Sequence, residues 1–442
     1  MNALLTDLYQ LTMAAGYWQA GKCEEIATFE LFVRRLPANR NFLVAAGLEQ
    51  AVEYLLNLRF EEEEISYLKS LPQFARVEEG FFDYLRRFRF TGDVFAAREG
   101  TPLFAGEPIL IVRAPLVEAQ IPETYLLATV GFQSLVATKA ARLMEASGGR
   151  AVVEFGTRRA HSPQAGVIAA RAAYIGGCAG TSNVLAGMRY GIPVFGTSAH
   201  AWVQSFASET EAFERLQALL GPAATYLIDT YNTLDGARRA VAIGKPFWGV
   251  RLDSGNLVEL SRAVRSVLDS GGFPDAKIMA TGDLNEYKIL ELVAAGAPID
   301  VYGVGTELAT SSDAPSHGAV YKLVEIAARG QRRYTAKYSE EKSTLPGAKQ
   351  VFRFADHDLL ACAHECAMGS EALIRPVVLN GRLVARLDSA AGAREHARAS
   401  IASLPAKLRS LFEADPPWPV ELSEELQGLS ANVRDREREV AR

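Results

Sequence analysis

The sequence GVRLDSGN, residues 249–256, joins an apolar strand to a polar turn that can begin a helix. Arg251 and Asp253 stand two residues apart, so in a strand their side chains point to the same side, near the strand's carboxyl end. Such a pair is either a structural ion pair or part of a site that binds a phosphorylated sugar. Similar turns elsewhere in the chain help to decide between these interpretations.

Short strands, polar turns and amphipathic helices alternate in the middle of the chain. The expected strands are AVVEF, PVFG, TYLID, FWGVRLD, KIMAT and IDVYG, with a further short one near Tyr174–Cys178. This alternation predicts a parallel sheet with right-handed crossovers. No GxGxxG motif follows any of these strands, so we predict an irregular α/β barrel of about seven strands rather than an open dinucleotide-binding sheet.

The barrel, residues 121–318, is predicted to lie between two segments that build a second domain. Residues 1–120 mix helices and strands, and a long helix at 121–144 connects the domains. Residues 319–390 contain the expected strands VYKLVEIA, QVFRF, DLLACA and LVARLD, which can complete the sheet of the first segment. Residues 391–442 are interpreted as a helical segment with the charged tail RDREREVAR. The second domain is therefore α+β and discontinuous.

Composition excludes several classes of partner. The net charge of −5 gives no basic surface for nucleic acid or an acidic membrane. No apolar run is long enough to cross a bilayer, and the first residues lack a signal-peptide pattern, so we expect a soluble cytoplasmic protein. Four cysteines in 442 residues suit a reducing compartment. Cys362, His364 and Cys366 lie close together, but no second ligand pair follows, so a half-buried strand is favoured over a zinc site.

Polar turns follow the expected barrel strands, and in a barrel the carboxyl ends of the strands meet on one face. The turns are FGTRRAH, AGTSN, FGTSAH, IDTYNT, RLDSGN, ATGDLNEYK and YGVGTE. Their glycines, Gly282, Gly303 and Gly305, let backbone amides approach a phosphate. Their carboxylates and guanidinium groups can hold sugar hydroxyls, a divalent cation through water, and an anion; these are Asp229, Asp253, Asp283, Arg158, Arg159 and Arg251. We expect a polyphosphorylated sugar and an organic acid as ligands.

His200 lies two residues after Ser198 in GTSAHAWVQSF and belongs to the same set of turns. A lone histidine is commonly a helix cap or a core residue. Beside these carboxylates and arginines, a nucleophilic histidine becomes a credible hypothesis.

Several motifs together resemble the nicotinate phosphoribosyltransferase family over nearly the whole chain. They are LLTDLYQLTMAAGYW, EFGTRRAH, AGTSN, GTSAHAWVQSF, LIDTYNT, GVRLDSGN, ATGDLNEYKI and YGVGTELATSSDAP followed by VYKLVE. The resemblance implies transfer of phosphoribosyl from phosphoribosyl diphosphate to the ring nitrogen of nicotinate in NAD biosynthesis. It also implies Mg²⁺, ATP hydrolysis coupled through a phosphorylated histidine, and a homodimer with shared active sites.

The resemblance carries roles to individual positions. His200 matches the phosphorylated histidine, and the expected catalytic group is completed by Asp229, Arg251 and Asp253. Nicotinate is expected between Phe155 and Tyr9 of the neighbouring subunit, with its carboxylate near Arg158; the other substrate-binding residues are Asp7, Thr157, Ser182 and Thr197. Ribose and phosphates are expected at Gly282, Asp283, Gly303, Gly305 and Thr306, with Asp253 and Asp283 holding Mg²⁺ through water.

Alternative functions stay open at this point. Ser182 falls where nicotinamide-using relatives carry an aspartate, which would repel a carboxylate, so nicotinate is favoured over nicotinamide. Quinolinate would call for further basic residues. An unrelated barrel lyase or isomerase would need a Schiff-base lysine or a paired acid and base, and Lys277 begins its strand, at the wrong face. A silent binder of NAD precursors would be expected to lack His200, Asp253 or Asp283.

Overall fold

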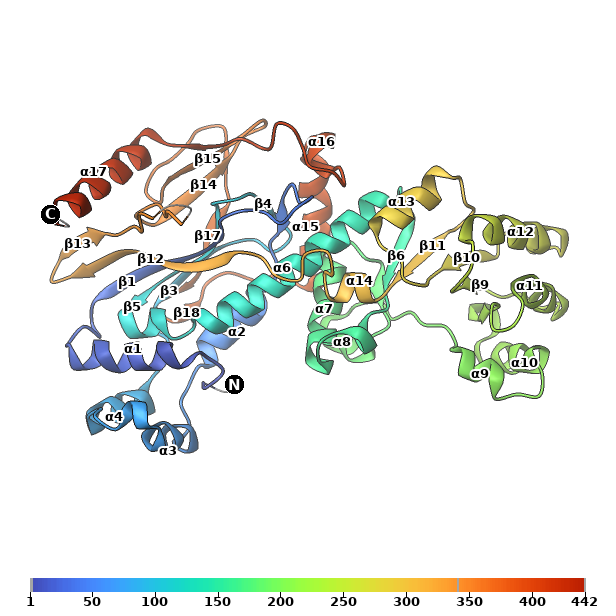
Figure 1. The fold of residues 1–442 in the computed structure, drawn as a ribbon, viewed down its shortest axis with the longest axis horizontal. Helices are drawn as coiled ribbons and strands as arrows, with labels where there is room; N and C mark the ends of the chain where they lie inside the picture. The colour runs from blue at the N-terminus through green and yellow to red at the C-terminus, as the bar shows by residue number, and fades with distance from the viewer. Residues whose placement is uncertain (1–2, 340–341, 441–442) are drawn as a thin grey trace.

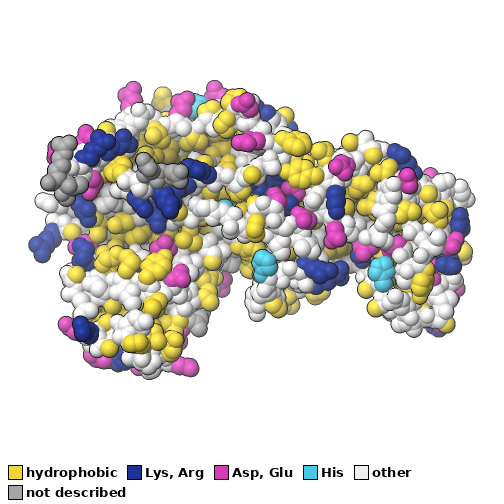
Figure 2. All heavy atoms as spheres, viewed as in Figure 1, with side chains coloured by type: hydrophobic (Ala, Val, Ile, Leu, Met, Phe, Trp, Pro, Cys, Tyr) yellow, Lys and Arg dark blue, Asp and Glu magenta, His cyan; other side chains and the backbone are white. Residues whose placement is uncertain are grey.

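The computed structural model describes residues 3–339 and 342–440 and shows two bodies joined by helix α6 (Glu123–Ala146) (Figure 1). One body is built from both ends of the chain, and the other is the α/β barrel of the central segment. Acidic and basic side chains are mixed over the face seen in Figure 2. Among the described helices, none combines the length and the apolar character needed to span a membrane.

The barrel contains a six-stranded parallel sheet in the order β7-β6-β11-β10-β9-β8. The strands are β6 (Ala151–Glu154), β7 (Gly180–Thr181), β8 (Thr225–Leu227), β9 (Gly249–Leu252), β10 (Lys277–Ala280) and β11 (Val301–Val304). Thr181 adds an isolated parallel bridge to Val194, and within the described residues no pairing connects Val194 to β8. The predicted irregular α/β barrel is confirmed, with a gap in the wall between these two segments.

Two details of the strand prediction are wrong. The run PVFG supplies only the bridge at Val194, so the sheet has six strands where about seven were predicted. The apolar run Tyr174–Cys178 is no strand, because its first two residues end helix α7 (Pro163–Ile175) and a glycine pair then turns the chain toward β7. A buried helix end and a buried strand both read as a short apolar run.

Helices follow the barrel strands and begin at asparagines in four of the polar turns. The side chains of Asn183, Asn232, Asn256 and Asn285 each accept a hydrogen bond from a backbone N–H in the first turn of the next helix. The helix start predicted after RLDSGN is therefore confirmed. The helices after α7 are α8 (Val184–Tyr190), α9 (His200–Gln204), α10 (Glu209–Leu220), α11 (Thr233–Ala242), α12 (Leu257–Ser270), α13 (Glu286–Ala294) and α14 (Thr306–Ala309), with 3₁₀ turns at Thr157–Arg159 and Gly221–Ala223.

The other body is organised around a seven-stranded antiparallel sheet in the order β13-β12-β1-β5-β3-β17-β18. Its strands come from both chain ends: β1 (Ile26–Val33), β3 (Asp93–Ala97), β5 (Pro108–Pro115), β12 (Ala319–Ala328), β13 (Gln331–Tyr334), β17 (Ile374–Leu379) and β18 (Arg382–Leu383). Phe29 of β1 pairs with Leu323 of β12 on one side and with Val112 of β5 on the other. The later segment thus adds strands to the sheet that the first segment begins.

Smaller elements complete this body. A four-stranded sheet has the order β16 (Glu371–Ala372), β14 (Lys349–Arg353), β15 (Asp358–Cys362) and β19 (Val420–Leu422), and β2 (Leu43–Val44) pairs with β4 (Pro102–Leu103). Further helices are α1 (Leu8–Gln19), α2 (Leu48–Asn57), α3 (Glu62–Ser70), α4 (Glu79–Arg87), α5 (Leu116–Gln120), α15 (Ala390–Ser403), α16 (Ala406–Arg409) and α17 (Glu424–Val440), with a 3₁₀ turn at Pro72–Phe74.

The C-terminal third departs from the sequence prediction in two places. The strand expected at LVARLD is mostly irregular, and the long strand here is β17, which precedes it. The segment 391–442 is not wholly helical, because β19 pairs with β15 in parallel. This segment also divides between the bodies: α15 packs on α7 of the barrel, whereas α17 packs on β15.

A buried cluster of charges fixes α6 against the barrel. The Lys139 ammonium, on α6, is 1% exposed and lies 2.5 Å from Glu286 and 2.8 Å from Asp313. Arg142, one turn later, donates to the second oxygen of Glu286 at 3.0 Å. Because each buried charge has an opposite partner, the cluster holds the helix that connects the two bodies in place.

Candidate functional site

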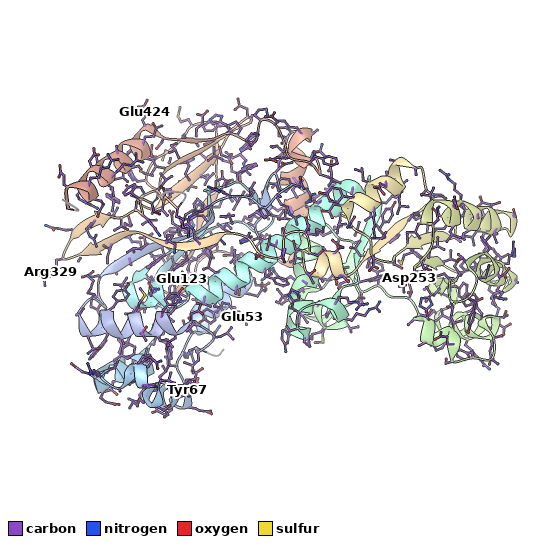
Figure 3. The ribbon with its side chains drawn as sticks, in the orientation of Figure 1. Glu53, Tyr67, Glu123, Asp253, Arg329 and Glu424 are labelled. Carbon is purple, nitrogen blue, oxygen red and sulfur yellow. The ribbon has the colours of Figure 1, made fainter. Side chains whose placement is uncertain are left out.

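A cavity of about 400 Å³ opens at the carboxyl ends of β6, β9, β10 and β11. It is the face on which the polar turns were predicted to meet, and Asp253 marks it in Figure 3. Twelve of the residues singled out from the sequence line it: Phe155, Arg158, Arg159, Ser182, Thr197, Arg251, Asp253, Gly282, Asp283, Gly303, Gly305 and Thr306.

The Arg251 guanidinium is the centre of a hydrogen-bond network in this cavity. Its Nε donates to Thr281 Oγ1 at 2.8 Å, and its two terminal nitrogens donate to Thr197 Oγ1 at 2.9 Å and to Asp253 Oδ1 at 2.6 Å. Thr281 also donates to the same Asp253 oxygen. One terminal nitrogen also donates to the Ser198 carbonyl at 3.4 Å. A planar fork whose four partners lie in three different turns fixes the cavity wall in one geometry.

Asp253 is held in the ionised form by its neighbours. Burial alone would raise its pKa, but the hydrogen bonds from Thr281 and Arg251 outweigh burial, and the pKa lies below its ordinary value. Its Oδ2 lies 3.8 Å from His200 Nε2. The other ring nitrogen, Nδ1, is 3.1 Å from Thr230 Oγ1. His200 thus stands at the edge of the cavity, with one nitrogen toward a carboxylate and the other toward a hydroxyl group.

Asp229 stabilises the turn that contains Asp253 through hydrogen bonds. Its Oδ2 accepts from the backbone N–H of Asp253 at 3.0 Å and from Ser254 Oγ at 2.6 Å. Its Oδ1 is buried and has no hydrogen-bond partner among the described residues. Asp229 therefore positions Asp253 instead of lining the cavity itself.

An aromatic wall and free cations lie on the β6 side. The Phe155 ring packs on Gly303. An added Cβ at position 303 would lie 2.7 Å from the ring, so the position of the Phe155 ring depends on that glycine. Arg158 and Arg159 follow in an exposed 3₁₀ turn, and their side chains have no hydrogen-bond or ion-pair partner in residues 3–339 and 342–440. Thr157, in the same turn, accepts from Asn183 Nδ2 at 3.1 Å, so it braces the turn.

The turn after β10 needs a glycine for two reasons. Gly282 has a φ of +92°, and an added Cβ would collide with the backbone carbonyl of Asp253. Asp283 follows with a φ of +47°, and its carbonyl accepts from Lys288 Nζ at 2.7 Å. This tight approach brings the two aspartates of neighbouring turns to the same cavity.

Two predicted residues lie far from the cavity in the single chain. Asp7, at the start of α1, accepts a hydrogen bond from Thr124 Oγ1 at 2.8 Å. Figure 3 shows Glu123, the residue before Thr124, in the body that does not contain Asp253. Tyr9 is 47% exposed on the same helix, and burial raises its pKa. The chain by itself therefore does not bring Asp7 and Tyr9 to this site.

Sequence reasoning overlooked several residues of the site. Thr281 and Thr230 contact Arg251 and His200, and Glu307 lines the cavity while its carboxylate lies 3.5 Å from Lys139. Each of the three is the sequence neighbour of a residue that was predicted to lie in the site. The available signal was position in a polar turn, because threonine alone points to no chemistry.

Comparison with known proteins agrees with this geometry. Residues 4–131 match the family model of the nicotinate phosphoribosyltransferase N-terminal domain, and residues 151–337 match that of the nicotinate phosphoribosyltransferase family. The chain belongs to the nicotinate phosphoribosyltransferase family. It is therefore an enzyme of this class.

Individual relatives cover most of the chain. A nicotinate phosphoribosyltransferase of Mycobacterium tuberculosis is 43% identical over 98% of this chain and 94% of its own length. The Bacillus subtilis protein of the same name is 49% identical over 79% of this chain and 73% of its own. The crystal structure of human nicotinic acid phosphoribosyltransferase is similar with a TM-score of 0.83 and 31% identity, covering 97% of this chain and all of that one.

Proposed function

We propose that this enzyme transfers phosphoribosyl from 5-phosphoribosyl 1-diphosphate to the ring nitrogen of nicotinate in NAD biosynthesis, in the cytoplasm, and that ATP hydrolysis is coupled to the transfer through phosphorylation of His200. The observation that carries the proposal is the cavity in which Arg251, Asp253 and Thr281 form one network beside His200, with arginines that have no partner among the described residues in the turn after β6. Relatives named for this activity match most of the chain.

The reaction needs little proton chemistry from the protein. The pyridine nitrogen already presents a lone pair, so no general base is required for its attack on ribose C1. The barrier lies in departure of the diphosphate and in the positive charge that develops on the ribose. Placement of both substrates and stabilisation of charge by groups fixed beforehand, such as Arg251 and Asp253, lower this barrier.

The surroundings of His200 support its proposed role as the phosphoryl acceptor. It is partly exposed, and Asp253 lies 3.8 Å from Nε2 with a lowered pKa, so a negative charge faces the ring. That charge favours the cationic ring that forms when an imidazole nitrogen attacks the γ-phosphorus of ATP and ADP leaves. Thr230 fixes the orientation of the ring through Nδ1.

Arg158 and Ser182 favour the acid over the amide. Arg158 is an unpartnered guanidinium at the cavity in the described residues, and Ser182, in the turn after the neighbouring strand β7, brings no negative charge. A charge-assisted hydrogen bond is worth about 1.5 to 3 kcal/mol, which corresponds to a preference of roughly 10- to 100-fold for nicotinate over nicotinamide. Nicotinamide is therefore the substrate to test against.

The carboxylates of the cavity fit a magnesium ion bound through water. Asp283 has no side-chain partner in the described residues, and Asp253 keeps Oδ2 free of hydrogen bonds while Oδ1 is engaged. Oxygen donors that leave several waters in place suit Mg²⁺. When bound, Mg²⁺ would neutralise charge on the leaving diphosphate.

A homodimer with shared sites fits the exposed apolar residues of both bodies. On α1, Leu8, Tyr9 and Met13 are 38 to 47% exposed, and on α8 Val184 and Met188 are more than 70% exposed. Apolar patches of this kind mark protein interfaces. If α1 of one subunit packs beside the pocket of its neighbour, Asp7 and Tyr9 reach the site from which they are absent in the single chain.

The decisive experiment offers the enzyme phosphoribosyl diphosphate and Mg²⁺ with nicotinate or nicotinamide, with and without ATP, and measures mononucleotide formation. We expect product from nicotinate, more of it with ATP, and a 10- to 100-fold lower kcat/KM for nicotinate in Arg158→Ala. Arg238→Ala, an exposed arginine on α11, is the matched control. Absence of product from nicotinate overturns the proposal, and equal use of nicotinamide overturns the specificity.

The role of His200 and the shared site have separate tests. His200→Ala should lose nicotinate-dependent ATP hydrolysis and keep slow ATP-independent transfer, whereas His357→Ala, in the other body, should keep both; coupling that survives in His200→Ala refutes the phosphohistidine. Mixing inactive Tyr9→Ala with His200→Ala should restore about a quarter of the coupled activity, because random pairing gives one native site in half of the dimers. No recovery contradicts shared sites.

A further inference from the structure

A second cavity lies in the body built from both chain ends. Its volume is about 580 Å³, larger than that of the barrel pocket. It lies between the seven-stranded sheet and the layer formed by β14, β15 and α17. Figure 1 shows these elements on the side of α6 away from the barrel strands. The cavity volume falls in the range that holds small ligands.

The pattern of β5 explains why this space is not filled by the core. Leu110 and Val112 face one side of the sheet and are fully buried. Ile111 and Arg113 point to the other side, where Thr28 pairs with Arg113 and Phe95 pairs with Ile111. This second side mixes apolar and polar residues, and the smaller sheet and α17 cover it. Because this side carries polar as well as apolar side chains, the two layers do not pack together here as in a core, and the cavity lies between them.

The cavity offers an apolar floor and an aromatic side. Phe95, Ile111 and Ile374 contribute from the large sheet, Tyr334 from β13 and Leu429 from α17. Ile111 and Ile374 are less than 10% exposed. Such walls suit a flat apolar group.

One cation at the cavity has no counterion. Arg113 is exposed, and its guanidinium has no hydrogen bond or ion pair in the described part of the chain. The acids that line the cavity are engaged, because Thr28 donates to Glu325 at 2.8 Å and His364 lies 2.8 Å from Glu425. Lys349 does not compete, since its ammonium is 2.8 Å from buried Glu30. An anion is therefore attracted to Arg113.

The only cysteine among the cavity-lining residues does not suggest covalent chemistry. Burial raises the pKa of the Cys362 thiol to about 11, so the thiol stays protonated at neutral pH. A protonated thiol is a poor nucleophile and packs like a small apolar side chain. The cavity is suited to reversible binding.

We propose that this cavity is a second ligand site, which takes a small organic monoanion with a flat apolar body and places its carboxylate or sulfonate against Arg113. The site is separate from the barrel pocket, and the proposal stands independently of the transferase reaction. Binding there bridges the sheet shared by both chain ends and the α17 layer, so an occupant would stabilise this body against unfolding.

The experiment titrates the full-length enzyme with 8-anilino-1-naphthalenesulfonate, an aromatic monoanion whose fluorescence rises in apolar surroundings. Arg113→Ala removes the cation, and Ala363→Trp places a ring at the exposed, cavity-lining position 363. Matched controls are Arg382→Ala on the edge strand β18 and Ala367→Trp in the same loop as residue 363. Thermal unfolding of each unliganded variant checks that it folds.

We expect Arg113→Ala to weaken binding of the dye at least 10-fold and Ala363→Trp to abolish high-affinity binding of the dye. Both controls should bind the dye like the parent enzyme. Two results overturn the proposal. Equal binding by Arg113→Ala and Arg382→Ala shows that the cation is not used. Loss of binding in Arg113→Ala but not in Ala363→Trp places the anion on the outer surface and not in the cavity.

Discussion

Replacing Gly282 by alanine should damage the proposed active site far more than it damages the fold. The added Cβ would lie well inside 3.0 Å of the Asp253 carbonyl oxygen, a separation that real Cβ atoms essentially never show. The carbonyl must therefore move by on the order of 1 Å, and a displacement of this size at a catalytic turn costs about 100-fold in rate. We expect kcat/KM for phosphoribosyl diphosphate to fall by about 100-fold, or about 2.7 kcal/mol of transition-state stabilisation.

The control for this variant is Gly296→Ala. Gly296 also has a positive φ, +64°, but no atom lies within 4 Å of an added Cβ. Both variants share the backbone strain, about 1 to 2 kcal/mol, and only Gly282→Ala displaces Asp253. Initial rates of mononucleotide formation measure the activity, and urea unfolding measures the strain. If the two variants keep kcat/KM values within threefold of each other, the turn after β10 does not set the catalytic geometry.

Three further variants test other parts of the structure. Arg251→Lys keeps the charge but loses at least two of the four hydrogen bonds of the fork, each worth about 1 kcal/mol, so kcat/KM should fall about 30-fold or more in the same assay. Lys139→Met leaves the carboxylates of Glu286 and Asp313 without their buried ammonium and should lower the free energy of unfolding in urea by about 3 to 5 kcal/mol. Glu107→Gln should stabilise the protein increasingly as pH rises, because burial and the neighbouring Asp358 raise the pKa of Glu107 well above its ordinary value. The native state favours the protonated form, so stability is fully present below the unfolded-state pKa of about 4.3 and is lost as pH rises toward the raised pKa.

Each of these has a matched control. Arg238→Lys changes an exposed arginine on α11 and should leave activity unchanged. Lys245→Met changes an exposed lysine and should alter the unfolding free energy by less than about 0.5 kcal/mol. For Glu107→Gln, a stability difference from the parent that is constant between pH 4 and pH 8 contradicts the raised pKa. Full activity in Arg251→Lys contradicts the role of the fork.

Local patterns predicted one part of the site and could not predict another. The side-by-side placement of Arg251 and Asp253 follows from the two-residue period of a strand, and the helix start at Asn256 follows from its capping side chain. The partners Thr281 and Thr197 lie 30 and 54 residues from Arg251 in the chain. Only the barrel brings them together, so no local pattern identifies them.

The strands that were missed have physical reasons. Pro376 interrupts IRPVVL, and a proline normally argues against a strand; β17 accommodates it at a register shift in its pairing with β3. β19 has three residues after a proline-rich stretch, too few for a periodic signal. Asp7 and Tyr9 were named through family resemblance alone, because within one chain they lie on an exposed helix in the other body.

The sheet shared by both chain ends dictates an order of events during synthesis. Phe29 pairs with Leu323, so β1 cannot find its neighbour β12 until nearly three hundred further residues have left the ribosome. All six strands of the barrel lie within that interval and can pair among themselves first. Contacts so distant in sequence form slowly, and until then β1 keeps an open edge to which another strand can add. The nascent chain is therefore most vulnerable to aggregation while the barrel is already folded and its first sheet is still incomplete.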